Sequence, residues 1–243
     1  MCAGIGDIDL LSMTWEDLLF AHWRVDPAVV EERLPEGLTV ATYEGDAYLG
    51  VVPFVMSSIG PRFAPLDISF GELNLRTYVR ETGDDSSGDG TDRGEGPRGV
   101  YFFNLDADDR LGVAIARSAF RLPYYRAEMT VDAAGDRVAF RSQRPDGSAA
   151  FAAAYGPDGD SFAPEAGSLE AFLVENYRFY TADDRGGIWY GDIDHEPWEL
   201  APATADFVGN ELFAVNGFDH PDGEPVLHYA PRIAVTAGAP RRA

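Results

Sequence analysis

Apolar and polar residues alternate with a period of two through residues 67–80, DISFGELNLRTYVR. In an extended chain, this spacing places alternate side chains on opposite faces of a strand. One face carries Phe70, Glu72, Asn74 and Arg76, whereas the other face is mostly apolar. The pattern therefore predicts a strand with a carboxylate, an amide and a guanidinium on one side.

Further strands are predicted where alternation recurs between turn residues. Residues 38–56 alternate on both sides of the turn EGD, which predicts a hairpin. Residues 99–107 predict another strand, and residues 124–156 predict three strands joined by turns at AAGD and RPDG. Residues 186–200 return to a strand pattern, whereas residues 109–120 fit either a strand or a helix.

The end signals of a short helix are present in residues 26–37. Asp26 is a good N-cap, and Pro27 suits the first helical position because its missing N–H would be unpaired there anyway. Pro35 and Gly37 end the segment. We therefore predict one short helix between two strands.

A second helix is predicted over residues 168–181, where Ser168 can cap an apolar stripe of leucine and aromatic residues. Residues 14–25 begin with a cap-like Thr14 and then take a strand pattern. Many antiparallel strands with two or three peripheral helices predict an α+β fold, mainly antiparallel β, built on a curled sheet or barrel.

The length and turn spacing predict a single domain over residues 13–236. Residues 1–12 are expected to form a flexible leader and residues 237–243 a tail, with fraying from Pro231 onward. Residues 81–98 have almost no apolar side chains, which predicts a mobile acidic loop.

Charge changes this picture more than any other feature of the composition. The formal net charge is −22, and every basic side chain other than histidine is an arginine, because the chain contains no lysine. Salt at molar concentration screens the resulting self-repulsion, so we expect a cytoplasmic protein of a salt-accumulating halophile with an acidic proteome. The alternative is an ordinary acidic protein that lacks lysine. Such a surface disfavours nucleic acid and anionic membranes as partners.

Motifs for common cofactors and metals are missing from the sequence. Cys2 is the single cysteine, which excludes an intramolecular disulfide or a thiolate cluster. The four histidines are scattered without metal-ligand spacing. The segment DIDHEP could gather carboxylates around His195, but we favour a solvated turn. No signal peptide or membrane-spanning stretch is evident. We expect no metal and no cofactor.

The polar face of residues 67–80 has two interpretations. If it points into a barrel, Arg76 could hold a substrate carboxylate, because its planar fork matches two oxygens. Glu72 could then be a general acid or base. The alternative is a buried or half-buried ion pair between strands, and the sequence leaves both open.

Five segments resemble the YqjF-like family of uncharacterised proteins: SFGELNLRTYV, GVYFFNLDA, ARSAFRLPYY, GSLEAFLVENYRFYT and HEPWEL. The resemblance runs from about Trp15 to about Pro202, and the motifs follow the order found in the family. It implies the acetoacetate decarboxylase-like fold, which is a mainly antiparallel β-barrel or cone with peripheral helices.

A more distant resemblance to acetoacetate decarboxylase bears on the chemistry. The pair Ala116–Arg117 resembles a Gly-Arg pair of that enzyme, six residues before a proline that precedes two lysines. One of those lysines forms an imine with the substrate, but here the two positions hold Tyr124 and Tyr125. Glu72 resembles a pocket glutamate of the enzyme. Because an imine requires a primary amine, the resemblance does not extend to an imine-forming decarboxylase.

The candidate catalytic residues are Glu72, Tyr124 and Tyr125. Adjacent strand residues face opposite ways, so one tyrosine at most can face a pocket. The candidate ligand-binding residues are Asn74, Arg76, Arg117, His22 and Arg24.

We expect a protein that binds an oxygenated or carboxylated metabolite in its barrel without the Schiff-base lysine. The alternative is a lysine-independent acid/base enzyme, of lyase or isomerase type, that acts on a small oxo acid through Glu72 and a tyrosine. The expected partners are a small-molecule ligand and, because relatives with this fold often assemble, a second copy of the chain in a homo-oligomer.

Overall fold

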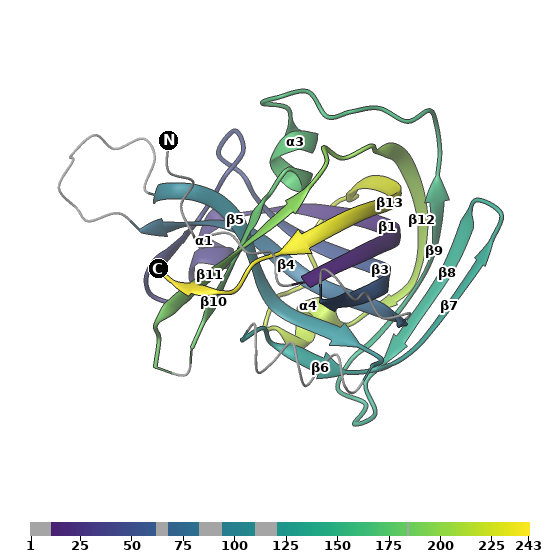
Figure 1. Cartoon of the computed structure of the whole chain (residues 1–243), viewed down its shortest axis with the longest axis horizontal. Coiled ribbons are helices and arrows are strands. Elements are labelled where there is room, and N and C mark those ends of the chain that lie inside the picture. Colours follow the sequence, from purple (N-terminus) through teal and green to yellow (C-terminus); the bar gives the residue numbers. More distant parts are fainter. Residues whose placement is uncertain (1–10, 62–67, 83–93, 110–120, 184) are drawn as a thin grey trace.

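The computed structural model describes residues 11–61, 68–82, 94–109, 121–183 and 185–243. Strands dominate this part of the chain (Figure 1). They are β1 (Leu11–Val25), β2 (Leu38–Val40), β3 (Ala47–Pro61), β4 (Ser69–Thr82), β5 (Gly94–Ala107), β6 (Tyr124–Arg126), β7 (Glu128–Ala134), β8 (Arg137–Gln143), β9 (Ala150–Pro157), β10 (Arg178–Ala182), β11 (Ile188–His195), β12 (Ala201–Asn210), β13 (Val226–Ala237) and β14 (Arg241–Arg242). The helices are α1 (Pro27–Glu31), α3 (Leu169–Val174) and α4 (Leu212–Val215).

Seven of the strands close into a ring. The hydrogen-bonded order runs β11-β10-β5-β4-β3-β1-β13, and β13 pairs again with β11. Most pairs are antiparallel, whereas β10–β5 and β5–β6 are parallel. The structure therefore confirms an α+β fold that is mainly antiparallel β, curled into a ring-like cone.

A second layer covers part of the outside of the ring. The sheet continues from β13 through β12, β9, β8 and β7, which lie along one side of the molecule in Figure 1. The outward residues Leu73 and Leu75 of β4 belong to the same buried cluster as Phe140 and Phe151 of this layer. Alternation along β4 therefore buries both faces, one against the second layer and one toward the inside of the ring.

The predicted short helix is confirmed with its cap. The Asp26 carboxylate accepts a hydrogen bond from the backbone N–H of Ala28 at 2.9 Å, and Pro27 opens α1. The strands joined by the AAGD and RPDG turns are also confirmed as β7, β8 and β9. These elements depend on local signals, namely a cap, a proline and turn residues.

The predicted second helix is correct at its start and wrong at its end. Ser168 caps α3 by accepting a hydrogen bond from Ala171 N–H at 3.2 Å, but α3 ends at Val174. Residues 178–182 form β10 instead, which pairs in parallel with β5 and in antiparallel with β11. Pairing with β5, which is distant in sequence, and with the adjacent β11 overrides the local helical pattern.

Other elements also differ from the predictions because of distant partners. The predicted hairpin over residues 38–56 is confirmed only at its turn, where Tyr43 and Asp46 form an antiparallel bridge, because β2 pairs with β4 rather than with β3. Thr14 is not a cap but lies within β1. The chain after Pro231 does not fray, because β13 is paired with β1, β11 and β12.

The edges of the predicted regions shift by a few residues. Leu11 and Ser12, assigned to the leader, begin β1. The ends of the segment 81–98 belong to β4 and β5, and residues 241–242 of the tail form β14. The segment 110–120, with its choice between strand and helix, lies outside the described residues.

Candidate functional site

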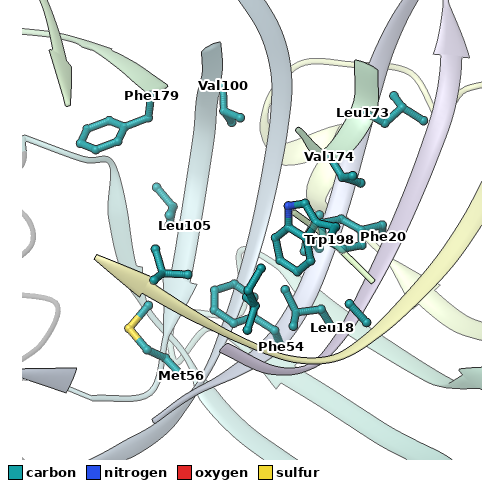
Figure 2. Packing of buried hydrophobic residues seen from close by; sticks show 14 of the residues in the cluster. Leu18, Phe20, Phe54, Met56, Val100, Leu105, Leu173, Val174, Phe179 and Trp198 are labelled. Carbon is teal, nitrogen blue, oxygen red and sulfur yellow. The ribbon is translucent and has the colours of Figure 1, made fainter. Parts of the chain in front are cut away.

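A cavity of about 390 Å³ lies inside the ring, among the side chains of the inner hydrophobic cluster. Figure 2 shows part of this cluster, with Trp198 beside Phe20. The volume falls in the range typical of small-molecule sites, roughly 300–1,000 Å³. The cavity wall is mostly apolar, and its polar side chains include Glu72, Arg76, Tyr124, Asn176, Arg178 and His195.

Strand β4 supplies the predicted polar face. Glu72, Asn74 and Arg76 are all buried, with 3%, 3% and 8% of their surfaces exposed. Glu72 and Arg76 line the cavity together with Phe70, whereas Asn74 shares their face without reaching the wall. The period-two pattern therefore predicted which side chains of β4 lie on the inner side of the sheet.

Glu72 is held by a tyrosine from β6. The Tyr124 hydroxyl donates a hydrogen bond to Glu72 Oε2 at 2.7 Å, and both side chains are buried. Burial raises the pKa of Glu72 from 4.5 to about 7, although hydrogen bonds from Tyr124 and Asn74 act in the opposite direction. Burial and the neighbouring carboxylate raise the pKa of Tyr124 well above its ordinary value. Near neutral pH, Glu72 can therefore gain or lose a proton while Tyr124 keeps its own.

The neighbouring tyrosine points the other way. Tyr125 is 42% exposed, and the Arg144 guanidinium carbon lies 4.0 Å from the centre of its ring. Successive strand residues alternate between faces, so Tyr124 enters the cavity and Tyr125 packs on the outside. Tyr125 is therefore removed from the candidate catalytic residues by its position.

Arg76 is buried at the cavity wall without an acidic partner. In the described part of the chain, no ion pair joins it to Glu72 or to any other carboxylate. Its Nε atom has no hydrogen-bond partner there, and its guanidinium lies 5.2 Å from the Phe20 ring centre and 5.9 Å from that of Tyr78. The predicted alternative, a buried or half-buried ion pair between strands, is not formed by Arg76 within the described residues.

His22 lies behind Arg76 rather than in the cavity wall. The two residues flank Gly50 in the register of β1, β3 and β4. A side chain at Gly50 would have its Cβ 2.8 Å from His22 Cδ2 and 3.4 Å from Arg76 Cγ. The glycine therefore lets the imidazole and the arginine side chain approach each other across the sheet.

The hydrogen bonds of His22 define its tautomer. Tyr78 has one hydroxyl proton and donates it to the Leu173 carbonyl at 2.5 Å, so the 2.6 Å contact to His22 Nε2 requires that nitrogen to be the donor. Burial, Arg76 and His228 lower the pKa of His22 well below its ordinary value. His22 is therefore a neutral group that orders Tyr78 beside Arg76.

One predicted ligand-binding residue, Arg24, lies away from the cavity. Arg24, expected to share the barrel mouth with His22, has 70% of its side chain exposed and forms a 3.1 Å ion pair with Asp46. It lies at the end of β1, where the chain turns into α1. Arg117 lies outside the described residues.

His195 is a cavity residue that sequence reasoning missed. It was predicted to lie in a solvated turn, but only 8% of its surface is exposed and it lines the cavity. Its ring stacks on Tyr177 with centres 4.5 Å apart, and it lies 5.2 Å from the Trp198 ring. The bond between Nδ1 and the Glu196 carbonyl makes Nδ1 the donor and leaves Nε2 as an acceptor. The only local signal was the apolar tryptophan three residues later.

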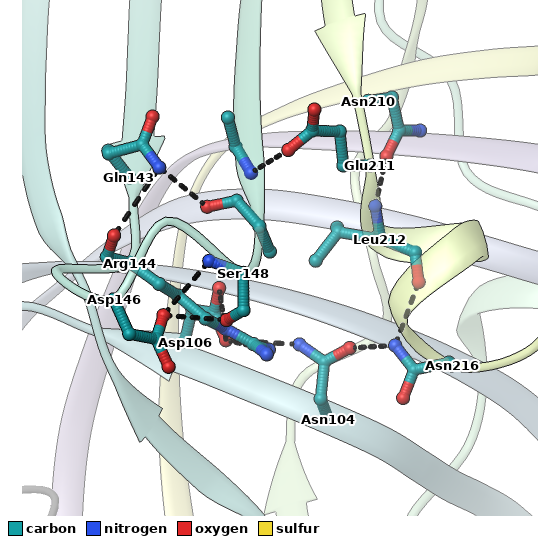
Figure 3. Close-up of polar contacts among 12 residues, drawn as sticks. Asn104, Asp106, Gln143, Arg144, Asp146, Ser148, Asn210, Glu211, Leu212 and Asn216 are labelled. Atoms are coloured by element: carbon teal, nitrogen blue, oxygen red, sulfur yellow. Dashed lines mark hydrogen bonds and ion pairs between the residues drawn. The ribbon is translucent and has the colours of Figure 1, made fainter.

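A second buried carboxylate lies on the outer side of the ring wall. Arg144 Nη2 contacts Asp106 Oδ1 at 2.6 Å, and the two side chains are 8% and 2% exposed. Asn104 donates to the same carboxylate at 3.2 Å and accepts from Asn216 of the segment after α4 (Figure 3). This cluster links β5 to the β8–β9 turn and to α4, and each charge has its counterpart.

Among the described residues, no group of three or more His, Cys, Asp or Glu side chains is arranged to hold a metal ion. No helix in the same part of the chain has the length and apolar character needed to cross a membrane.

Solved structures with the same fold include acetoacetate decarboxylase from Legionella pneumophila, which matches with a TM-score of 0.66 and 11% identity over 96% of this chain and 87% of that one. An acetoacetate decarboxylase-like enzyme from Sphingomonas wittichii matches with a TM-score of 0.61 and 16% identity, covering 98% and 94%. The enduracididine biosynthesis enzyme MppR, complexed with pyruvate, matches with a TM-score of 0.64 and 13% identity, covering 99% and 92%.

The sequence itself has a nearer relative. The uncharacterized protein YqjF of Bacillus subtilis is 40% identical over 225 residues, which cover 91% of this chain and 87% of YqjF. Residues 12–234 match the model of DUF2071, described as an uncharacterized conserved protein family. With its closed ring of strands and its internal cavity, the chain belongs to the DUF2071 family and has the acetoacetate decarboxylase-like fold.

Proposed function

We propose that the cavity binds a small metabolite that carries a carboxylate, with Arg76 as its anchor. The observation that carries the proposal is the buried guanidinium at the cavity wall, which has no carboxylate partner in the described residues. A buried charge is costly unless it is paired, and a ligand carboxylate can supply the missing partner in two parallel hydrogen bonds. In this proposal the Arg76 guanidinium binds the ligand and does not serve to hold elements of the fold together.

Glu72 and Tyr124 form a second polar group in the cavity wall, and it suits an oxygen atom of the ligand. The two side chains are hydrogen-bonded to each other and lie beside apolar side chains. In its protonated form Glu72 donates to a carbonyl, and in its ionised form it accepts from a hydroxyl. The structurally similar MppR has been solved with pyruvate, which supports an oxo acid as the ligand class.

Calorimetric titration tests the proposal. The probes are four carboxylic acids: pyruvate, 4-oxopentanoate, octanoate and 7-oxooctanoate. At least one acid should bind, and Arg76→Gln should weaken its binding about 100-fold, because a buried charged hydrogen bond contributes about 2–5 kcal/mol. Arg24→Gln is the matched control, since it removes an exposed guanidinium outside the cavity and should leave affinity unchanged. Binding by none of the acids, or equal binding by Arg76→Gln, would contradict the proposal.

A second candidate function is acid/base catalysis on an oxo acid. It is favoured by the burial of Glu72 in the cavity wall, which raises its pKa to about 7 and suits a group that takes and returns protons at neutral pH. Glu72 would remove a proton from carbon next to the ligand's carbonyl, and Tyr124 would donate to the enolate oxygen. The chain has no lysine, so an imine with a side-chain amine is not part of this route.

Deuterium exchange distinguishes the enzyme from the binding protein. In D2O, an enzyme of this kind should exchange the protons beside the ketone of a bound oxo acid, as followed by proton NMR. Glu72→Gln should reduce the exchange rate about 100-fold or more, and Tyr125→Phe should not change it. If the parent protein exchanges these protons no faster than the uncatalysed reaction, acid/base catalysis is contradicted and ligand binding remains the proposed function.

A further inference from the structure

Two of the polar groups in the cavity wall lie far apart on one strand. Glu72 and Arg76 share the inner face of β4 and both line the cavity. Four residues of extended chain separate their Cα atoms by roughly 13 Å. No ion pair bridges the gap, so the carboxylate and the guanidinium are two separate polar ends of one cavity.

The wall between these two ends is apolar. In the register of β4 and β5, Arg76 is opposite Phe102 and Asn74 is opposite Leu105. Phe102 and Leu105 both line the cavity, whereas the Asn74 side chain does not. A ligand that reaches from Arg76 to Glu72 therefore passes along hydrocarbon.

The cavity also extends along the strand rather than being confined to one level of the ring. Phe70, Glu72 and Arg76 of β4 contribute to its wall, as do Ile68 just before β4 and Val100 of β5. Positions 68 and 76 are roughly 26 Å apart along an extended strand. A narrow, elongated ligand fits this arrangement better than a compact one.

We propose, resting on the function proposed above, that the ligand is an extended bifunctional acid, with its carboxylate at Arg76 and a carbonyl or hydroxyl oxygen at Glu72 and Tyr124. The two side chains stand side by side on one face of β4, so a hydrogen bond of about 3 Å at each end of the roughly 13 Å separation leaves room for roughly four to seven carbon atoms. The part of the ligand between its two oxygen groups is hydrocarbon, because Phe102 and Leu105 form the cavity wall beside it.

A short oxo acid satisfies only one end of this cavity. If pyruvate binds at Arg76, its carbonyl stays near the arginine, and the Glu72–Tyr124 pair remains without a ligand atom. A longer chain adds hydrophobic contact along the wall and places its second oxygen at the carboxyl group of Glu72. A longer hydrocarbon chain increases the affinity of any fatty acid, so chain length by itself does not test the proposal. The position of the second oxygen atom does.

Two isomers separate oxygen position from length and hydrophobicity. The first, 7-oxooctanoate, carries its ketone far from the carboxylate, and the second, 4-oxooctanoate, carries it near the middle of an equal chain. Calorimetry at pH 6 should show 7-oxooctanoate binding about tenfold more tightly than 4-oxooctanoate or octanoate. It should also show 7-oxooctanoate binding more tightly than pyruvate or 4-oxopentanoate.

Variants at each end identify the contact that each oxygen makes. Tyr124→Phe and Glu72→Gln should reduce the advantage of 7-oxooctanoate over octanoate, while Arg76→Gln should weaken both acids alike. Circular dichroism and thermal unfolding confirm that each variant is folded, and Tyr125→Phe is the control outside the cavity.

Two results would overturn the inference while leaving the proposed function intact. The first is tighter binding of pyruvate or 4-oxopentanoate than of 7-oxooctanoate, with the affinity still dependent on Arg76. The second is equal affinity for the two isomers, which would mean that the distal oxygen is not recognised. Failure of every acid to bind, or binding that ignores Arg76→Gln, instead overturns the proposed function and the inference with it.

Discussion

Two buried carboxylates lie on neighbouring strands, in adjacent pairs of the same register, and face opposite sides of the ring wall. Glu72 is opposite Ala107, and Asp106 is opposite Leu73. Asp106 contacts the Arg144 guanidinium through both of its oxygens, whereas Glu72 accepts a hydrogen bond from a tyrosine and has no cation beside it among the described residues. A completed ion pair holds elements of the fold together, whereas a buried charge without a counterpart is available to a ligand.

The two buried arginines show the same contrast. Arg144 bonds to Asp106 and covers the Tyr125 ring, so its charge is used within the fold. Arg76 has no carboxylate partner among the described residues and lies at the cavity wall beside the rings of Phe20 and Tyr78. Removing Arg144 should therefore damage stability, and removing Arg76 should damage binding.

The largest expected effect is on stability. Arg144→Ala leaves the Asp106 carboxylate buried without its cation, which should lower the free energy of unfolding by about 3–5 kcal/mol in urea denaturation. Arg137→Ala removes an arginine whose ion pair with Asp206 is exposed, and it should cost no more than about 1 kcal/mol. A loss below 1 kcal/mol for Arg144→Ala would contradict this prediction, because the Arg144–Asp106 ion pair would then contribute little to the free energy of unfolding.

The next effect is the pH dependence that Glu72 gives to stability. Its pKa is raised in the folded state from 4.5 to about 7, so the folded protein binds the proton more tightly than the unfolded chain does. This contribution to stability is fully present below pH 4.5 and is lost as the pH rises through 7. A pKa shift of this size corresponds to about 3 kcal/mol in the free energy of unfolding.

Glu72→Gln isolates this contribution from the other acidic groups. The free energy of unfolding of the variant, minus that of the parent, should rise by about 3 kcal/mol between pH 4.5 and pH 8 in urea titrations. The subtraction cancels the titration of the remaining carboxylates. A difference that stays constant with pH would show that Glu72 is ionised with an ordinary pKa, as an exposed or paired carboxylate would be.

The smallest expected effect concerns the tyrosine pair. The hydrogen bond from Tyr124 lowers the pKa of Glu72, so Tyr124→Phe should raise that pKa further, by up to about one unit. Tyr125→Phe should leave it unchanged, because Tyr125 faces outward. Carbon-13 NMR of labelled glutamate measures both shifts. Equal shifts in the two variants would mean that the tyrosines are not distinguished by the cavity.

The local parts of the structure could be predicted from sequence. Alternation along β4 predicted that Glu72, Asn74 and Arg76 share a face, since strand geometry depends only on neighbouring residues. The caps at Asp26 and Ser168 were likewise visible, because each cap bonds within three residues of itself. The ring fold followed from the number of strands and from the resemblance of whole segments.

The remaining features depend on contacts between distant residues. Period-two spacing showed that Tyr124 and Tyr125 diverge, but only the pairing of β6 with β5 decides which one enters the cavity. His195 is buried by Tyr177 and Trp198 after the chain has folded back on itself. Spacing also could not show that Arg24 reaches solvent at the end of β1 and pairs with Asp46.

Closure of the ring joins strands from opposite ends of the described chain. Leu11 of β1 pairs with Ala237 of β13, and both residues line the cavity. During synthesis on the ribosome, this wall stays open until β13 has emerged and paired with β1. Such distant pairing forms slowly, so the apolar strands of the unfinished ring stay exposed to aggregation until β13 is in place.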